Sequence, residues 1–363
     1  MGGHFARGAM DPPLSRRVTD WGKTNPAMAN IPMTDPQFDV LTIGNAIVDV
    51  IAKVDDAFIA REKLVKGSMN LIDEARAEEL YGHMGPAQEV SGGSAGNTAA
   101  GVGSFGGRAA YFGKIKRDQL GDIFRHDMKT QGVHFNSVAA ADGPATARSF
   151  ILVTPDSERT MNTYLGACVN LTTADIEDAV VKASRVTYME GYLYDRPDAK
   201  DAFRRASDIA RAANRLTSVT LSDSFCVERH RDDFLHLIRS RIDIVFANET
   251  EIKSLYQTQN FNGAVEAIRK DCTIAVLTRS EKGSVIVRGK ETVEVPAHTV
   301  SKIVDVTGAG DLFAAGFLFG FTREMPLRRC AELGGLAAAE VISHVGARPE
   351  VNLKDHAQAA GLL

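Results

Sequence analysis

The sequence has few cysteines, and they are poorly placed to act together. The four of them, Cys168, Cys226, Cys272 and Cys330, are widely spaced and form no C-x-x-C pair. This spacing argues against both a zinc site and a disulfide framework. We therefore expect reduced, partly buried thiols in a cytoplasmic protein.

Long apolar runs and an excess of positive charge are also missing. No apolar run approaches the roughly 20 residues that a membrane span requires. The net charge is −4, so the chain has no basic footprint for nucleic acid or for an anionic membrane surface. We expect binding to neither.

Tryptophan is nearly absent, and its one position is uninformative. Trp21 lies within residues 1–32, which show no periodic pattern and lack the apolar segment of a signal peptide. We expect residues 1–37 to be a disordered tail or an artificial extension, with a natural start near Met33. The whole chain is 44% hydrophobic and 24% charged, which is ordinary for a globular protein.

Two common nucleotide-binding signatures are missing or misplaced. No G-x-x-x-x-G-K-[ST] pattern occurs, so a P-loop enzyme is not expected. A literal G-x-G-x-x-G covers residues 101–106, but it closes a helical pattern and precedes a strand pattern at 109–112. Because the dinucleotide fingerprint must follow a strand and open a helix, we reject a dinucleotide-binding fold.

What the chain does have is a regular alternation of helix and strand patterns. Helices are expected at 74–84, 94–106, 119–131, 173–182, 198–214, 230–240, 248–257, 262–270 and 326–343. Strands are expected at 38–44, 109–112, 185–189, 217–221, 242–246 and 273–278, with hairpins over 149–164 and 284–296 and extended segments over 50–72. The alternation predicts an α/β fold in which helices sandwich a mostly parallel sheet.

The most informative stretch runs from Asp305 to Phe321. Gly308, Ala309 and Gly310 precede an apolar run that predicts a buried helix, so an anion could approach the free N–H groups at its start. An acid at Asp311, beside a bound phosphoryl group, could accept the proton of an attacking hydroxyl. The alternative is an ordinary helix start, capped by Thr307 and with Asp311 in its first turn.

Two other pairs of polar residues follow predicted strands. Asn45 and Asp49 come after strand 38–44, where ligands gather in open α/β sheets, although an Asx turn and a surface acid would also explain them. Asn248 and Glu251 follow strand 242–246 and could hold Mg²⁺ through waters. They could equally form an N-terminal capping box, and both can be true together.

Across residues 38–352, motifs in a fixed order resemble those of the ribokinase-like (PfkB) carbohydrate kinase family. These motifs are GGSAGN at 92–97, NETE at 248–251, TRSEKG at 278–283, DVTGAGD at 305–311 and GA at 346–347. They resemble the family's G-G-x-x-x-N, N-x-x-E, T-x-G-x-x-G, D-T/V-T-G-A-G-D and G-A patterns. Ser280 departs from them, because it replaces the first glycine of the nucleotide-binding segment.

The resemblance implies a ribokinase-like three-layer sandwich with a mostly parallel central sheet, plus a small β-sheet lid. The large α/β domain would comprise residues 38–50, 73–144 and 167–354. Residues 51–72 and 145–166 would form the lid and close over the substrate. Because lid edges pair between chains in some relatives, both a monomer and a homodimer remain open.

The resemblance also implies roles for the matching residues. Asp311 would be the general base, the backbone amides of Gly308, Ala309 and Gly310 the anion hole, and Arg159 would reach from the lid to the phosphates. The residues that would hold the substrate are Asn45, Asp49, Gly93, Ser94, Asn97 and Tyr192. Those near ATP would be Asn248, Thr278, Gly283, Gly308 and Gly310, with Mg²⁺ at Asn248 and Glu251 through water and a monovalent cation such as K⁺ at Asp305.

The segment from Gly44 to Asp49 (GNAIVD) resembles the adenosine kinases of the family (G-N-P-L-L-D) more than its ribokinases. The Asn45 amide could donate to a purine nitrogen, while Asp49 could accept from a ribose diol. Gly335 departs from that pattern, because adenosine kinases often carry a histidine there, beside the adenine of ATP. The resemblance implies an ATP- and Mg²⁺-dependent kinase that phosphorylates the 5′-hydroxyl of a purine nucleoside, above all adenosine.

Three alternatives stay open from the sequence. A sugar kinase of the same family would act on ribose, fructose or a keto-deoxy sugar acid. A catalytically silent binding protein could keep the fold, although the retained Asp311 and glycine turn argue against it. A hydrolase that uses Asp311 to activate water would consume ATP without any acceptor.

Overall fold

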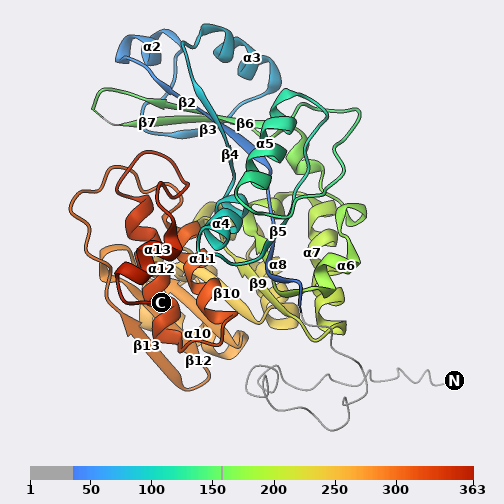
Figure 1. Ribbon diagram of the computed structural model, residues 1–363, viewed down its shortest axis with the longest axis vertical. Helices are drawn as coiled ribbons and strands as arrows, with labels where there is room; N and C mark the ends of the chain where they lie inside the picture. The colour runs from blue at the N-terminus through green and yellow to red at the C-terminus, as the bar shows by residue number, and fades with distance from the viewer. Residues whose placement is uncertain (1–35, 157) are drawn as a thin grey trace, which may run out of the picture.

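The computed structural model describes residues 36–156 and 158–363, so nearly all of the expected tail, including Trp21 and Met33, lies outside the described residues. Two separate sheets organise the chain (Figure 1). The larger has eight strands in the order β13-β12-β11-β10-β9-β8-β1-β5. The smaller has five, in the order β3-β7-β6-β2-β4.

The large sheet is mostly parallel, as the alternating pattern predicted. Its strands are β1 (Phe38–Ile43), β5 (Ala109–Phe112), β8 (Ser184–Glu190), β9 (Leu216–Thr220), β10 (Ile244–Asn248), β11 (Ile274–Thr278), β12 (Ser284–Arg288) and β13 (Glu291–Val295). Pairing is parallel from β5 through β1, β8, β9 and β10 to β11. The predicted hairpin of β12 and β13 adds two antiparallel strands at one edge. All six residues of β1 are buried, as expected for a strand that is covered on both faces, although Asp39 and Thr42 interrupt its apolar sequence.

Helices cover both faces of this sheet and give the α/β fold its three layers. Helices α4 (Ser94–Ser104), α11 (Ala309–Phe321) and α12 (Leu327–Val341) pack with alternate strand residues such as Val40. Helices α7 (Pro197–Ala212), α8 (Ser224–Arg241) and α10 (Phe261–Asp271) pack with the neighbouring residues, such as Leu41. The remaining helices of the large part are α5 (Gln119–Thr130), α6 (Asp178–Lys182), α9 (Glu249–Leu255) and α13 (Leu353–Ala359). The helix expected at 173–182 is instead a 3-10 turn at Thr173–Asp175 followed by α6.

The small-residue runs of the sequence let α11 lie close to two neighbouring helices. A Cβ at Gly316 would lie 2.5 Å from the carbonyl oxygen of Leu333 in α12. A Cβ at Gly101 of α4 would lie 2.6 Å from the Cβ of Ala315. Every residue of α11 from Leu312 to Phe321 is buried. Close packing on both sides therefore fixes the position of its N-terminus.

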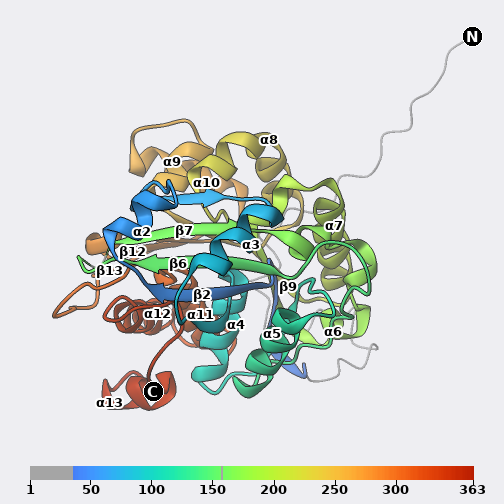
Figure 2. The same cartoon turned by 90° about the horizontal axis from the view of Figure 1, so that it is seen from above.

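The small sheet is capped on its outer face by two helices. Its strands are β2 (Ile47–Lys53), β3 (Met69–Leu71), β4 (Gln88–Gly92), β6 (Ala147–Val153) and β7 (Arg159–Tyr164). Figure 2 shows α2 (Asp56–Arg61) and α3 (Glu74–His83) lying over this sheet. The β6–β7 hairpin is confirmed. The division of the chain into two domains stays a prediction, and β4, which pairs with β2, comes from outside the range expected for the lid.

The expectation of only extended segments over 50–72 is wrong for α2. Asp55 caps this helix by accepting a hydrogen bond from the N–H of Phe58, at 2.8 Å. Phe58 and Ile59 are then buried against the sheet. Since α2 has only six residues, fewer than two turns, it is too short to show a helical period in the sequence.

The helices and the cysteines of the described residues bear on two expectations from the sequence. In the described ranges, no helix combines the length and apolar character needed to cross a membrane. All four cysteines are free, and three of them are buried.

The close approach of α11 and α12 predicts that one methyl group will destabilise the fold. Gly316→Ala places a Cβ against the Leu333 carbonyl and should lower the free energy of unfolding by about 1–3 kcal/mol, the usual cost of overpacking. Gly82→Ala in α3 is the matched control, because a Cβ there meets nothing within 4 Å and should cost nothing. Urea unfolding of both variants tests this. If the midpoint of Gly316→Ala equals that of the control, α11 and α12 can move apart to accept the methyl group without a loss of stability.

Candidate active site

A cavity of about 450 Å³ lies where the small sheet faces the carboxyl ends of the parallel strands. Parallel sheets place ligand sites at this edge. Residues of the small sheet, such as Ile151 and Met161, form one wall, and the turn before α11 forms part of the other. The cavity lining brings together most of the residues singled out from the sequence: Asp49, Gly93, Ser94, Asn97, Tyr192, Asn248, Glu251, Thr278, Gly308, Ala309, Gly310 and Asp311.

The Asp311 carboxylate is held by two side chains of α4. Ser94 donates through Oγ to Oδ1 of Asp311 at 2.6 Å, and Asn97 donates through Nδ2 to Oδ2 at 2.9 Å. Thr98 adds a bond from Oγ1 to the Asp311 backbone carbonyl at 3.2 Å. Ser94 and Asn97, expected as substrate ligands, therefore also orient the expected base.

Burial raises the pKa of Asp311 above its ordinary value, because the charged carboxylate loses contact with water. Hydrogen bonds from Ser94 and Asn97 oppose this rise, as does the positive charge of Arg348. The carboxylate is thus shifted toward the range in which it can exchange a proton with a hydroxyl group.

The turn before α11 lines the cavity with Gly308, Ala309 and Gly310, although the N–H of Ala309 donates to the Val306 carbonyl at 3.2 Å. Gly308 adopts a φ of +77°, in the left-handed region that favours glycine. A Cβ there would also lie 2.8 Å from the Cβ of Ala347. No side chain of the described residues caps this helix end. Uncapped donors at a helix N-terminus fit a phosphate group.

Asp49 projects from β2 into the cavity and lies against β4. A Cβ at position 92 would lie 2.2 Å from Oδ2 of Asp49, so a side chain there would displace the carboxylate. Burial raises the pKa of Asp49 to about 7, opposed by Arg348 and reinforced by the nearby charge of Asp311. A half-buried carboxylate that no cation of the described residues bonds fits a ligand that supplies hydroxyl donors.

Asn45 lies behind the cavity rather than in its lining. Its Nδ2 donates to Oε1 of Glu190 at 2.9 Å, and its backbone N–H donates to Oε2 at 3.3 Å. Oε2 also accepts from the N–H of Ala95 in α4, at 2.8 Å. Contact between Asn45 and a purine stays a prediction, and it would require this amide to leave Glu190.

Arg159 connects the small sheet to the loop before the glycine turn. It forms an ion pair with Asp305, and its Nη1 donates to Oγ1 of Thr307 at 3.1 Å. Its Nη2 is buried and has no hydrogen-bond partner among the described residues. Arg159 does not line the cavity, so its contact with the phosphates stays a prediction, although a free donor close to the turn is compatible with an anion.

Asp305 has a second set of contacts. Its Oδ1 accepts from the N–H and the hydroxyl of Thr307, at 3.0 and 2.7 Å, and its Oδ2 accepts from the N–H of Gly346 at 3.1 Å. With Arg159 also bonded to it, a monovalent cation at Asp305 would have to share this carboxylate. That cation site stays a prediction.

Asn248 and Glu251 form the capping box that the sequence allowed. The N–H of Glu251 donates to Oδ1 of Asn248 at 2.8 Å, and the N–H of Asn248 donates to Oε2 of Glu251 at 2.9 Å. Burial raises the pKa of Glu251 to about 7. Within the described ranges, no cluster of three or more acidic, histidine or cysteine side chains could hold a metal directly. Both residues face the cavity, so binding of Mg²⁺ through water is compatible with the donor set.

Of the residues expected near ATP on β11 and after it, one lines the cavity and one does not. Thr278 ends β11 in the cavity wall, whereas Gly283 lies outside the lining, at a φ of +82° with its Cα close to Val295. Ser280, which stands where the family's pattern has glycine, takes a φ of +51°, in the left-handed region that favours glycine. Gly335 lies beside His298, since a Cβ there would be 4.0 Å from the Cβ of His298.

The sequence analysis missed Arg348, which follows the Gly346–Ala347 pair directly. Its Nε donates to the carbonyl of Ser91 at 2.9 Å and its Nη1 to the carbonyl of Gly96 at 2.6 Å. Nη2 donates to Oγ of Ser91 at 2.9 Å. One guanidinium therefore ties β4 to α4, and it lowers the pKa of Asp49 and of Asp311. The only feature of the sequence that could have pointed to Arg348 is its position directly after the Gly346–Ala347 motif.

Comparisons with known proteins agree with this geometry. Residues 38–353 match the pfkB family carbohydrate kinase. The adenosine kinase from Sinorhizobium meliloti has a solved structure that is 59% identical, with a TM-score of 0.83, covering 89% of this chain and 99% of that one. A probable sugar kinase protein from Rhizobium etli CFN 42 is 54% identical, with a TM-score of 0.84, covering 90% and 100%.

A more distant relative is similar over nearly the same length. The adenosine kinase from Saccharomyces cerevisiae is 28% identical over 339 residues, which cover 86% of this chain and 96% of that protein. Sequence, fold and site thus point the same way. The chain belongs to the pfkB family of carbohydrate kinases, phosphotransferases that act on an alcohol group.

Proposed function

We propose that this protein transfers the γ-phosphoryl group of ATP to the 5′-hydroxyl of a purine nucleoside, with adenosine as the preferred acceptor. The observation that carries the proposal is Asp311, a carboxylate with a raised pKa at the start of an uncapped helix and in the same cavity as Asp49. The similarity to proteins named adenosine kinase supports the choice of acceptor.

In this mechanism Asp49 and Asn97 hold the ribose, and Asp311 acts on its 5′-hydroxyl. Asp49 accepts hydrogen bonds from the ribose diol, which compensates its burial. Asp311 accepts the proton of the 5′-hydroxyl as the oxygen attacks phosphorus, and Ser94 and Asn97 keep its carboxylate aimed. Tyr192 lines the same cavity and offers a ring face to the base.

The glycine turn stabilises the charge on the transferred group. The backbone N–H groups of Gly308 and Gly310 face the phosphoryl oxygens, and that of Ala309 joins them once it leaves the Val306 carbonyl. The helix dipole adds to their effect. Arg159 offers its unpartnered Nη2 from the small sheet. Mg²⁺, held through water by Asn248 and Glu251, supplies charge neutralisation at the ATP phosphates when bound.

The small sheet excludes water from the transfer. Ile151 and Met161 present apolar side chains to the cavity from β6 and β7. Since water competes with the acceptor hydroxyl for the phosphoryl group, this wall favours transfer over hydrolysis.

A second candidate is a sugar kinase of the same family, because one relative that is 54% identical carries that description. Coupled ADP release with ATP and Mg²⁺ should separate the two candidates, with adenosine, inosine, guanosine, ribose and fructose as acceptors. We expect a strong preference for adenosine. Turnover on a free sugar alone would keep the chemistry and overturn the nucleoside assignment. ADP release without any acceptor would indicate a hydrolase.

The proposed base predicts a specific kinetic defect. Asp311→Asn keeps the shape of the side chain but removes its basicity, so kcat should fall by about a hundred- to ten-thousand-fold while acceptor binding changes little. Isothermal titration with adenosine and steady-state kinetics measure the two effects separately. Asp198→Asn, on an exposed turn of α7, is the control and should behave like the wild type. Near-normal turnover of Asp311→Asn would remove the residue from the mechanism.

The charge of Arg348 predicts a shift in the pH profile. Activity requires ionised Asp311, so kcat/KM should fall as the pH drops through its raised pKa. Arg348 lowers that pKa, and Arg348→Met should therefore move the acid limb to higher pH. Arg348→Lys keeps the charge and should leave the limb near its wild-type position. If the methionine variant is only less stable and its limb does not move, Arg348 does not act on Asp311.

A further inference from the structure

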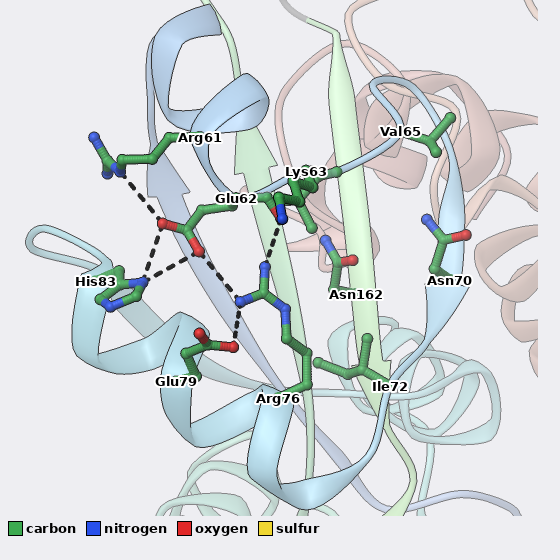
Figure 3. A pocket seen from close by; sticks show the side chains of 11 residues that line it. Arg61, Glu62, Lys63, Val65, Asn70, Ile72, Arg76, Glu79, His83 and Asn162 are labelled. Carbon is green, nitrogen blue, oxygen red and sulfur yellow. Dashed lines mark hydrogen bonds and ion pairs between the residues drawn. The ribbon is translucent and has the colours of Figure 1, made fainter.

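A second cavity, of about 840 Å³, lies on the outer face of the small sheet beneath α2 and α3 (Figure 3). It is separate from the candidate active site because successive side chains of a strand point to opposite faces. Met161 and Thr163 of β7 line the active-site cavity, whereas Asn162 between them lines the outer one. One strand thus serves two cavities.

A buried carboxylate organises one side of this outer cavity. Glu62, at the end of α2, accepts from Nε of Arg61 at 3.3 Å and from Nη1 of Arg76 at 3.2 Å, and its carboxylate lies 3.1 Å from Nδ1 of His83. Arg76 also donates to the Glu62 carbonyl at 2.7 Å and to Glu79 at 2.7 Å. Figure 3 shows these bonds linking the end of α2 to α3, so they hold this wall of the cavity in one arrangement.

Asn162 provides the observation that points to a ligand. The residue is 1% exposed, and its Nδ2 has no hydrogen-bond partner among the described residues. Figure 3 shows this amide on β7, between the side chains of Arg76 and Asn70. An unsatisfied buried donor is costly, so a group that persists in this state calls for an acceptor supplied from outside.

The lining shows which kind of acceptor fits. It contains three fixed cations, Arg61, Lys63 and Arg76, against two carboxylates, Glu62 and Glu79. Among the described residues, Lys63 forms no ion pair, whereas Arg61 and Arg76 do. Apolar side chains, Leu64, Val65 and Ile72, form the rest of the wall. Excess positive charge beside an apolar surface suits an organic anion better than a fully hydrated inorganic one.

We propose that the outer cavity is a binding site for a small organic carboxylate. One carboxylate oxygen accepts the hydrogen bond of Asn162 Nδ2, Lys63 balances the charge, and the hydrocarbon part packs on Leu64, Val65 and Ile72. Because the ligand bonds to β7 on one face, it stiffens the strand that forms the active-site wall on the other. The site does not depend on which acceptor the enzyme phosphorylates.

Isothermal titration of the full chain with succinate, citrate and benzoate, in a buffer free of phosphate and sulfate, tests the proposal. We expect at least one of the three to bind saturably, and Asn162→Leu to weaken it by at least about tenfold, the usual effect of losing a hydrogen bond to a charged group. Binding by none of the three, or equal binding by Asn162→Leu, would overturn the site.

Two controls separate lost binding from lost folding. Asn162→Leu removes an unsatisfied donor, so its urea midpoint should equal or exceed that of the wild type while binding is lost. Lys63→Gln should weaken the carboxylate severalfold, whereas Lys66→Gln should not, because Lys66 pairs with Asp56 and Asp156 outside the cavity. Equal effects of the two lysine variants would show only general charge attraction. Since binding is measured without ATP or acceptor, failure here leaves the kinase assay unaffected.

Discussion

The contact of Asp311 with Ser94 and Asn97 is the interaction on which the candidate site depends. It joins the starts of two helices that are more than two hundred residues apart in the chain. Both helices are rich in small residues, so their backbones approach closely and short polar side chains can span the gap. The resulting carboxylate is half-buried, ionisable and fixed in direction. Without that contact, the glycine turn would be only another helix start.

The Arg159–Asp305 pair plays a similar part between the two sheets. Arg159 belongs to the small sheet and Asp305 to the loop before α11, so the ion pair holds the small sheet over the cavity. Gly346 donates to the same carboxylate, and two residues later Arg348 bonds to β4 and α4. The short segment from Gly346 to Arg348 therefore connects the main parts of the site. It places a positive charge near two acids, Asp49 and Asp311. Without that charge, the ionisation of one acid would oppose the ionisation of the other more strongly.

Local patterns in the sequence predicted most of the fold, but they did not predict contacts between residues far apart in the chain. The β-α alternation predicted the parallel sheet, and Asn248 with Glu251 formed the capping box that their spacing allowed. The helix α2 was missed because six residues are too few to show a period. The bond between Asn45 and Glu190 spans 145 positions, and no local pattern marks a partner at that distance. Ser280 departs from the motif in sequence, yet its φ of +51° lies in the left-handed region that favours glycine.

The alternation of side chains along β7 limits how the small sheet can change. A shift of one residue in its register would turn Asn162 toward the active-site wall and Met161 toward the outer cavity. Substitutions can therefore alter the two cavities one at a time, but an insertion or deletion of a single residue within β7 would exchange their linings and damage both.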